Sequence, residues 1–175
     1  GSGAMAIGIP ALGKSDSEAY GAQLNDFTGI TGAQRFNMSG YAAPKIEKVR
    51  IGFIGLGMRG PGAVERMSFI EGVEIKALCD KLPERASAAQ KYLTGKGLAK
   101  AKEYSGENGW KDMIDKEDLD LIYICTPWHL HTPMAVYAME SGKHAATEVP
   151  AALTIADCWK LVETSEKTRK HCMML

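Results

Sequence analysis

The sequence predicts an α/β fold in which a doubly wound parallel sheet of the Rossmann type carries helices on both faces. Short apolar runs alternate with helix-like segments from residue 46 to residue 175, and this alternation is typical of a parallel sheet with crossover helices. A glycine-rich turn directly follows the first apolar run, at the place where such folds bind their ligand. Hydrophobic residues make up 45% of the chain, which is enough for the core of one domain.

The chain divides into an N-terminal extension, residues 1–45, and the Rossmann-type domain, residues 46–175. The extension begins with a small, apolar run that turns polar at Lys14–Asp16, as at the end of a secretory signal. A flexible tail is an equally good interpretation. The signal interpretation predicts an exported protein of the periplasm or cell envelope, and the tail interpretation predicts a cytoplasmic one. Residues 21–44 lack clear periodicity, and we expect a linker there.

Each element in the first half of the domain follows from its residue pattern. Val49–Ile54 is a short apolar run that suits a strand buried on both faces. Residues 60–70 suit a helix, because Pro61 is tolerated in a first turn. A proline near the start and a glycine beyond the end bracket the helix predicted at 83–93. The other elements predicted here are strands at 73–79 and 101–104 and a short helix at 110–116.

The second half continues the same alternation. Its strongest strand is predicted at 119–125, where the apolar run stops at Thr126. A helix is predicted at 154–169, with Thr154 as its N-cap. Four of its apolar residues recur at helical spacing and form one face, Ile155, Cys158, Trp159 and Val162. The other elements predicted here are a helix at 133–141 and strands at 143–147 and 171–175. Because the last strand would be interrupted at residue 175, the sequence suggests the front part of a longer protein whose substrate domain is absent from this chain.

Charge and cysteine content restrict the possible partners. Lys+Arg and Asp+Glu are both 21, so no overall basic surface is expected to attract nucleic acid. No stretch approaches the ~18–20 apolar residues of a membrane helix. The four cysteines form no CxxC pair, and we expect buried small hydrophobes rather than a metal or redox site. In the expected strand order 3-2-1-4-5-6, Cys79 and Cys125 flank the central strand about 9–10 Å apart, which is too far for a disulfide.

The turn after the first strand has the spacing Gly55-x-Gly57-x-x-Gly60. Gly55 permits the tight turn, Gly57 lets a pyrophosphate approach the backbone, and Gly60 allows the helix to pack closely on the strand. The free amides at the start of the helix would then bind the anion. The strand before and the helix after the glycines make this a dinucleotide-binding prediction rather than a chance glycine triplet.

Asp80 indicates which dinucleotide is bound. It ends the second strand, 20 residues after Gly60, which is the spacing of the acid that binds the ribose hydroxyls. A carboxylate accepts a hydrogen bond from the 2′-OH and repels a 2′-phosphate, so the sequence predicts NAD rather than NADP. Arg59 would favour a phosphate, but we expect it to face the pyrophosphate or the ribose.

Two later loops lie at the same edge of the predicted sheet, because ligands sit outside the carboxyl ends of parallel strands. Trp128 and His131 lie in the loop after the strand at 119–125 and are expected to contact the cofactor. Glu148 follows the next strand and should face the nicotinamide side. Two imidazoles, His129 and His131, with Glu148 also suit a metal in principle. A loop of this kind fits a cofactor wall as well, and we predict no metal.

Taken together, these motifs resemble the Gfo/Idh/MocA oxidoreductase family over residues 46–175. Most members read Glu-Lys-Pro in the last motif, where the lysine assists proton movement at the hydroxyl being oxidised. Val149 occupies that position here, which disfavours simple alcohol dehydrogenation. The motifs that carry the resemblance are Gly55-Leu56-Gly57, Cys79-Asp80, Pro127-x-x-x-His131, Gly142-Lys143-His144 and Glu148-x-Pro150.

A narrower resemblance is to glycoside hydrolase family 109, which contains NAD-dependent α-N-acetylgalactosaminidases that are often exported. It rests on Gly57-Met58-Arg59-Gly60, Thr126-Pro127-Trp128, Glu148-Val149-Pro150 and Cys172-Met173-Met174-Leu175. The resemblance implies NAD contacts at Met58, Arg59, Asp80, Trp128, His129, Leu130, His131, Glu148 and Val149.

The same resemblance implies a reaction in which C3 of the sugar is oxidised and the C2 proton becomes acidic. Elimination of the glycosidic oxygen, addition of water and return of the hydride follow, so NAD stays bound. Carboxylate-pair glycosidases work differently. The family's catalytic tyrosine and histidine would lie beyond residue 175, so we assign no catalytic residue. Glu148 is the one candidate in this chain for a contact with the carbohydrate substrate.

Two other functions remain open at this point. One is an ordinary NAD-dependent sugar or polyol dehydrogenase, and the other is a non-catalytic NAD-binding domain. The residues beyond 175 would separate these readings. We also expect a homo-oligomer.

Overall fold

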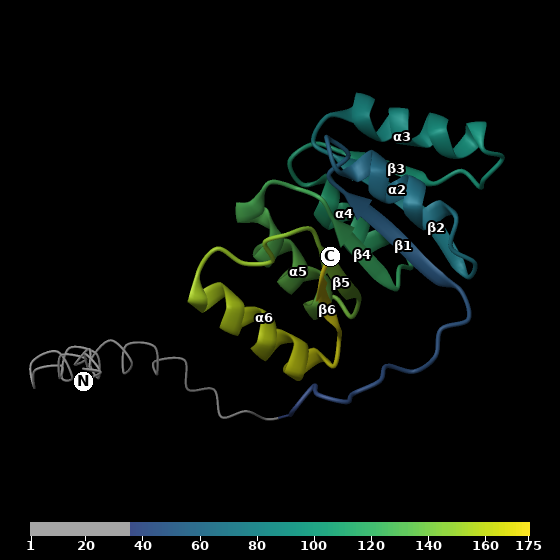
Figure 1. Cartoon of the computed structure of the whole chain (residues 1–175). Helices are drawn as coiled ribbons and strands as arrows, with labels where there is room; N and C mark the ends of the chain where they lie inside the picture. The colour runs from purple at the N-terminus through teal and green to yellow at the C-terminus, as the bar shows by residue number, and fades with distance from the viewer. Residues whose placement is uncertain (1–35) are drawn as a thin grey trace, which may run out of the picture. The chain divides into compact units, whose positions relative to one another are not determined.

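The computed structural model describes residues 36–175 and contains a six-stranded parallel sheet with helices on both faces (Figure 1). The strand order is β3-β2-β1-β4-β5-β6, which confirms the predicted doubly wound topology. The proposed signal remnant and most of the predicted linker lie outside the described residues. Among the helices of the described part, none is long and apolar enough to cross a membrane.

Every helix and strand predicted for the domain is present, with ends shifted by no more than two residues. The strands are β1 Val49–Ile54, β2 Val73–Asp80, β3 Lys102–Ser105, β4 Leu121–Ile124, β5 His144–Thr147 and β6 Cys172–Met174. The helices are α2 Gly60–Ser68, α3 Pro83–Gly95, α4 Gly109–Lys116, α5 His131–Glu140 and α6 Ile155–Thr168. A short 3-10 turn, η1 Trp128–Leu130, precedes α5 and was not predicted.

Alternation along the strands divides the core between the two faces of the sheet. Ile51 and Phe53 of β1 point to the face covered by α2 and α3. Ile54 of β1 and Ile124 of β4 point to the opposite face, which α4, α5 and α6 cover (Figure 1). Complete burial of one such side chain stabilises the fold by about 1.5–3 kcal/mol. The two cores thus hold the carboxyl ends of β1, β2 and β4 side by side.

Helix α6 differs from its prediction in the face that it buries. Thr154 is its N-cap, as predicted, and its hydroxyl accepts a hydrogen bond from the Asp157 N–H at 3.1 Å. The side chains of Ile155 and Trp159, however, are about half exposed. The buried residue that packs toward α5 is Leu161. The apolar face inferred from the periodicity is therefore an exposed surface in the described part of the chain.

Residues 36–45 were assigned to the extension, but they fall in the same compact unit as the domain. They form no helix or strand. The ring of Phe36 lies under the Arg169 guanidinium, and the ring of Tyr41 lies 5.5 Å from that of His171. These aromatic contacts attach the segment beside α6 and β6.

Candidate cofactor site

The glycine-rich turn connects β1 to α2, and its three glycines have different surroundings. Gly55 has φ +90°, and a Cβ there would lie 2.7 Å from the Cys125 carbonyl. A Cβ at Gly60 would lie 2.1 Å from the Gly55 carbonyl oxygen, whereas a Cβ at Gly57 would meet only the Arg85 guanidinium, at 3.3 Å. Gly55 and Gly60 are therefore required by the fold itself, and Gly57 keeps the backbone open toward a ligand.

The start of α2 is suited to an anion. Arg59 stands at its N-cap and makes no side-chain capping hydrogen bond to the helix. The first amides of a helix carry partial positive charge and bind phosphate groups when no side chain covers them. The turn therefore fits the pyrophosphate of a dinucleotide.

Asp80 lies at the end of β2, and its side chain is only 5% exposed. One carboxylate oxygen accepts a hydrogen bond from the Leu56 N–H at 2.6 Å, and the other accepts one from the Leu82 N–H at 3.0 Å. The Arg85 guanidinium is 3.6 Å away. Asp80 thus fixes the glycine-rich turn to the end of β2, a role that the sequence did not reveal. Because each carboxylate oxygen has further acceptor capacity, the predicted bond to a ribose hydroxyl is still possible.

These elements enclose a cavity of about 780 Å³ at the carboxyl ends of β1, β2 and β4, which we call the cofactor cavity. Its volume is in the range of small-molecule and cofactor pockets. Eight of the twelve predicted cofactor residues line it, namely Gly55, Gly57, Met58, Arg59, Asp80, Trp128, His129 and Leu130. It is also lined by residues that were not predicted, among them Lys81, Arg85, Glu107 and Trp110.

The loop after β4 forms one wall of the cofactor cavity. Trp128, at 62% exposure, is among the most exposed large apolar side chains of the described residues, and such a ring offers a flat surface for a planar ligand. Met58, on the glycine-rich turn, is 96% exposed. Two large apolar side chains exposed on one cavity are suited to contact with a ligand.

His131, which was expected to contact the cofactor, lies inside the protein. Its side chain is completely buried and does not line the cofactor cavity. Its ring nitrogens lie 2.7 Å from the carbonyl oxygens of Pro150 and Thr126. In this structure the ring therefore contacts backbone carbonyl groups of the protein and does not face the cofactor cavity. Gly60 also lies outside the cavity lining, because it is buried under the glycine-rich turn.

Glu148 and Val149 follow β5 at the same edge, but neither lines the cofactor cavity as it stands. The Glu148 N–H donates to the Ile124 carbonyl oxygen at 3.0 Å, which holds the segment beside β4. Val149 is 49% exposed. Within residues 36–175 no group of three or more His, Cys, Asp or Glu side chains could hold a metal ion.

Two thiols line the cofactor cavity, Cys79, which is buried, and Cys125, which is partly buried. Cys79 pairs with Ile54 in the sheet, and the Cys125 N–H donates to the Ile54 carbonyl oxygen. The two cysteines therefore flank β1, as the predicted strand order requires, and both are free thiols. Burial raises the pKa of each to about 12, and the negative charge of Glu148 adds to the effect at Cys125. Both remain protonated near neutral pH.

Arg85 is the most informative residue that the sequence reasoning missed. It lies in the first turn of α3, half exposed, between Asp80 and Gly57. Its position five residues after Asp80 was the available signal, because the first turn of that helix must lie at the same sheet edge. A guanidinium here can pair with ligand oxygens or stack on a base.

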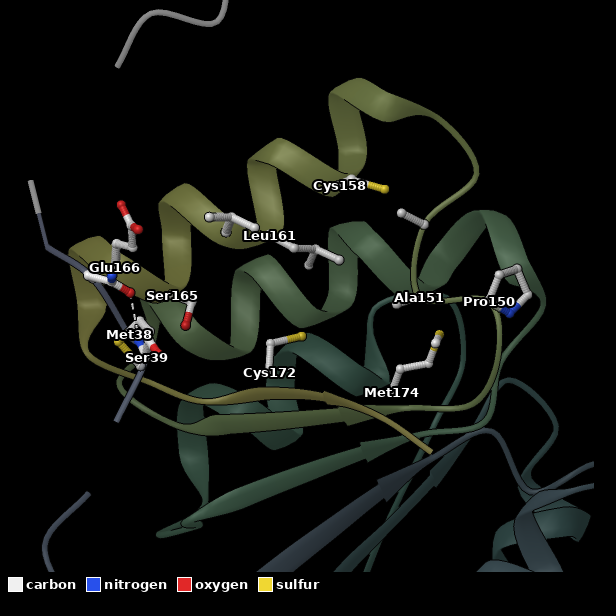
Figure 2. A pocket seen from close by; sticks show the side chains of 13 residues that line it. Met38, Ser39, Pro150, Ala151, Cys158, Leu161, Ser165, Glu166, Cys172 and Met174 are labelled. Carbon is white, nitrogen blue, oxygen red and sulfur yellow. Dashed lines mark hydrogen bonds between the residues drawn. The ribbon is translucent and has the colours of Figure 1, made fainter. Parts of the chain in front are cut away.

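A second cavity, of about 590 Å³, lies between α6, β6 and residues 37–39 (Figure 2). Leu161, Cys172 and Met174 are among its mainly apolar lining residues. None of the predicted cofactor residues lines it. The glycine-rich turn therefore identifies the cofactor cavity, and not this one, as the dinucleotide site.

Comparison with known families supports this assignment. The sequence pattern of a family described as an oxidoreductase family with an NAD-binding Rossmann fold, Gfo/Idh/MocA, matches residues 49–175. Among solved structures, myo-inositol 2-dehydrogenase from Lactobacillus plantarum aligns with a TM-score of 0.64 at 26% identity, over 73% of this chain and 36% of that one. The match begins at β1 and includes every residue of the cofactor cavity.

Two curated relatives are more similar in sequence. Glycosyl hydrolase family 109 protein 1 of Bacteroides thetaiotaomicron is 61% identical over 75% of this chain and 28% of its own length. A protein of Bacteroides fragilis named alpha-N-acetylgalactosaminidase is 55% identical over 78% of this chain and 32% of its own length. The chain therefore spans about a third or less of the curated relatives that it matches.

Proposed function

The chain belongs to the Gfo/Idh/MocA family of oxidoreductases, and from that premise we propose that it is the NAD-binding part of an α-N-acetylgalactosaminidase of glycoside hydrolase family 109. The observation that carries the proposal is the 55% identity to a protein named alpha-N-acetylgalactosaminidase, over 78% of this chain. The matched region spans 32% of that relative's length.

The residues of the cofactor cavity have separate tasks in this proposal. The amides at the start of α2 bind the pyrophosphate, Asp80 orients the adenosine ribose, and Trp128 shields one side of the bound molecule from water. NAD, when bound, supplies reversible hydride acceptance. Glu148 lies outside the lining of the cofactor cavity, in the loop after β5 at the same sheet edge, and in this proposal it meets the carbohydrate beside the nicotinamide.

Val149 favours the glycosidase over a simple dehydrogenase. It occupies the position where most family members carry a lysine, and its side chain is 49% exposed at the sheet edge. An isopropyl group transfers no proton, so this chain offers no base at that point for net alcohol oxidation. A reaction that returns the hydride within one cycle accumulates no NADH.

The test is hydrolysis of a chromogenic α-N-acetylgalactosaminide in D2O by a protein of the relatives' full length that carries this domain. We expect aglycone release, no accumulation of NADH, and one deuterium at C2 of the released sugar, because C2 loses its proton during the reaction. A glycosidase with a carboxylate pair is the control, since it leaves C2 untouched. Hydrolysis without deuterium would overturn the mechanism, and stoichiometric NADH without hydrolysis would support the dehydrogenase.

Export and self-association are further parts of the proposal. Export is supported by the small, apolar run that precedes Lys14, which lies outside the described residues. A homo-oligomer is supported by the exposed apolar face of α6, which includes Ile155, Trp159 and Val162. Cell fractionation and light scattering of the full-length protein test the two points separately.

A further inference from the structure

The first turn of α5 joins two loops that are far apart in the sequence. His131, the first residue of α5, is completely buried. Its Nδ1 lies 2.7 Å from the Pro150 carbonyl oxygen in the loop after β5, and its Nε2 lies 2.7 Å from the Thr126 carbonyl oxygen in the loop after β4. Both partners are backbone oxygens, so the two contacts depend on backbone position and not on the neighbouring side chains.

The next residue strengthens one side of this connection. The Thr132 hydroxyl donates a hydrogen bond to the Ala151 carbonyl oxygen at 3.0 Å, and Thr132 is 5% exposed. Two consecutive side chains of α5 thus hold two consecutive carbonyls of the loop after β5. Buried contacts of this kind are costly to break, because a carbonyl that loses its partner inside the protein finds no water.

The two joined loops both carry residues of the proposed site. Thr126 lines the cofactor cavity, and the wall formed by Trp128, His129 and Leu130 follows it directly. Pro150 directly follows Glu148 and Val149, which we place beside the nicotinamide. The contacts of His131 therefore fix the distance between the cavity wall and the residues that would face the substrate.

We propose that His131 is a positioning residue, which holds the loop after β4 against the loop after β5 and so sets the geometry of the cofactor cavity without touching the cofactor. The inference rests on the proposed binding of NAD in that cavity. It replaces the direct NAD contact that the sequence implied for His131 with an indirect role.

Two substitutions of His131 test its contacts with Pro150 and with Thr126 separately. The amide nitrogen of Asn lies close to the position of His Nδ1, so His131→Asn retains the bond to Pro150. The amide nitrogen of Gln lies close to Nε2, so His131→Gln retains the bond to Thr126. Both carbonyl oxygens are acceptors, so the His131 ring bonds both only when each of its nitrogens carries a proton. Each variant keeps a donor toward one carbonyl and loses the contact with the other, and we expect each to weaken NAD binding about tenfold at a temperature where it is fully folded.

The matched control is Gln90→Met. Gln90 is also buried, and its side chain accepts a hydrogen bond from the Ala101 N–H at 2.9 Å. Ala101 precedes β3, whose first residue pairs with Ala77 in the middle of β2, and neither Gln90 nor Ala101 lines the cofactor cavity. This variant should lower the melting temperature as much as the His131 variants do, while its NAD affinity stays within about twofold of wild type, because it breaks a bond of the same kind.

Calorimetric titration with NAD and thermal melting, on this chain and its variants, give the decision. Loss of affinity in both His131 variants but not in Gln90→Met supports the positioning role. If the His131 variants bind NAD with wild-type affinity but melt at a lower temperature, His131 stabilises the fold and does not position the cofactor site. If they do not fold, Thr132→Val decides in the same way, with an expected loss of about threefold to tenfold for one neutral bond. Failure of the wild-type chain to bind NAD would instead refute the proposed function.

Discussion

Among single residues, Gly57 and Gly60 have different roles: Gly60 is required by the fold, and Gly57 leaves space for a ligand. A Cβ at Gly60 has no space, because the Gly55 carbonyl oxygen would lie 2.1 Å from it. A Cβ at Gly57 meets only the end of the flexible Arg85 side chain. The glycine spacing in the sequence indicates both positions equally, and only the atomic surroundings distinguish their roles.

Gly60→Ala is therefore expected to destabilise the protein by about 1–3 kcal/mol or more, as overpacking does. Gly57→Ala should leave the melting temperature within a degree or two of wild type. Thermal unfolding followed by circular dichroism measures both variants. Equal destabilisation by the two substitutions would show that Gly57, too, is required by the fold.

Asp80 fixes the glycine-rich turn to the end of β2 and is also predicted to bind the ribose of NAD. Asp80→Ser removes the acceptor of the Leu56 and Leu82 amides, and we expect a lower melting temperature together with a loss of NAD affinity of about one to two decades. Discrimination against NADP should relax, because the repelling charge is gone. Glu107→Gln is the control, since Glu107 also lines the cavity but pairs only at its exposed rim with Lys81. Unchanged NAD affinity in Asp80→Ser would remove Asp80 from the site.

At the scale of elements, β1 and β4 are also joined at the edge opposite the cofactor cavity. Asp120 accepts hydrogen bonds from the Arg50 backbone N–H at 2.9 Å and from its guanidinium at 2.8 Å. These bonds with Arg50 lower the pKa of Asp120 from its ordinary value. A carboxyl whose pKa is lower in the folded state stabilises the fold above its unfolded pKa of about 3.9, and the contribution disappears as the pH falls through the folded value.

Asp120→Asn should accordingly lower the melting temperature by several degrees at pH 7, and the difference from wild type should shrink as the pH falls below the unfolded pKa of about 3.9. Melting curves over this pH range provide the measurement. Asp112→Asn is the matched control, because its pair with Lys116 is on the surface and about half exposed, and such pairs contribute little. A difference between Asp120→Asn and wild type that does not shrink as the pH falls would show that the ionised Asp120 carboxylate does not stabilise the fold.

The elements also show where sequence reasoning succeeds. Strand and helix positions follow from apolar runs and from glycine and proline, and these signals are local, as in Val49–Ile54. The exposed face of α6 could not be predicted, because periodicity gives an apolar face but not what covers it. His131 could not be predicted as buried either, because its burial depends on Pro150, 19 residues later in the chain.

For the whole molecule, the strand order places three separate segments at one sheet edge. The glycine-rich turn, Asp80 and the loop at Trp128 come together because β1 lies between β2 and β4. The topology was predictable, since parallel sheets of this kind have few arrangements. The side chains that line the cavity were less predictable. Arg85 was missed although its position in the first turn of α3, five residues after Asp80, was an available signal.

Binding of NAD in the cofactor cavity is tested most directly by calorimetric titration of the purified chain. We expect saturable, one-to-one binding of NAD, weaker binding of NADP, and a loss of at least about tenfold in affinity for Gly57→Ala, whose Cβ would block the approach of the pyrophosphate. Absence of NAD binding by the folded wild-type chain, or wild-type affinity in Gly57→Ala, would contradict the claim.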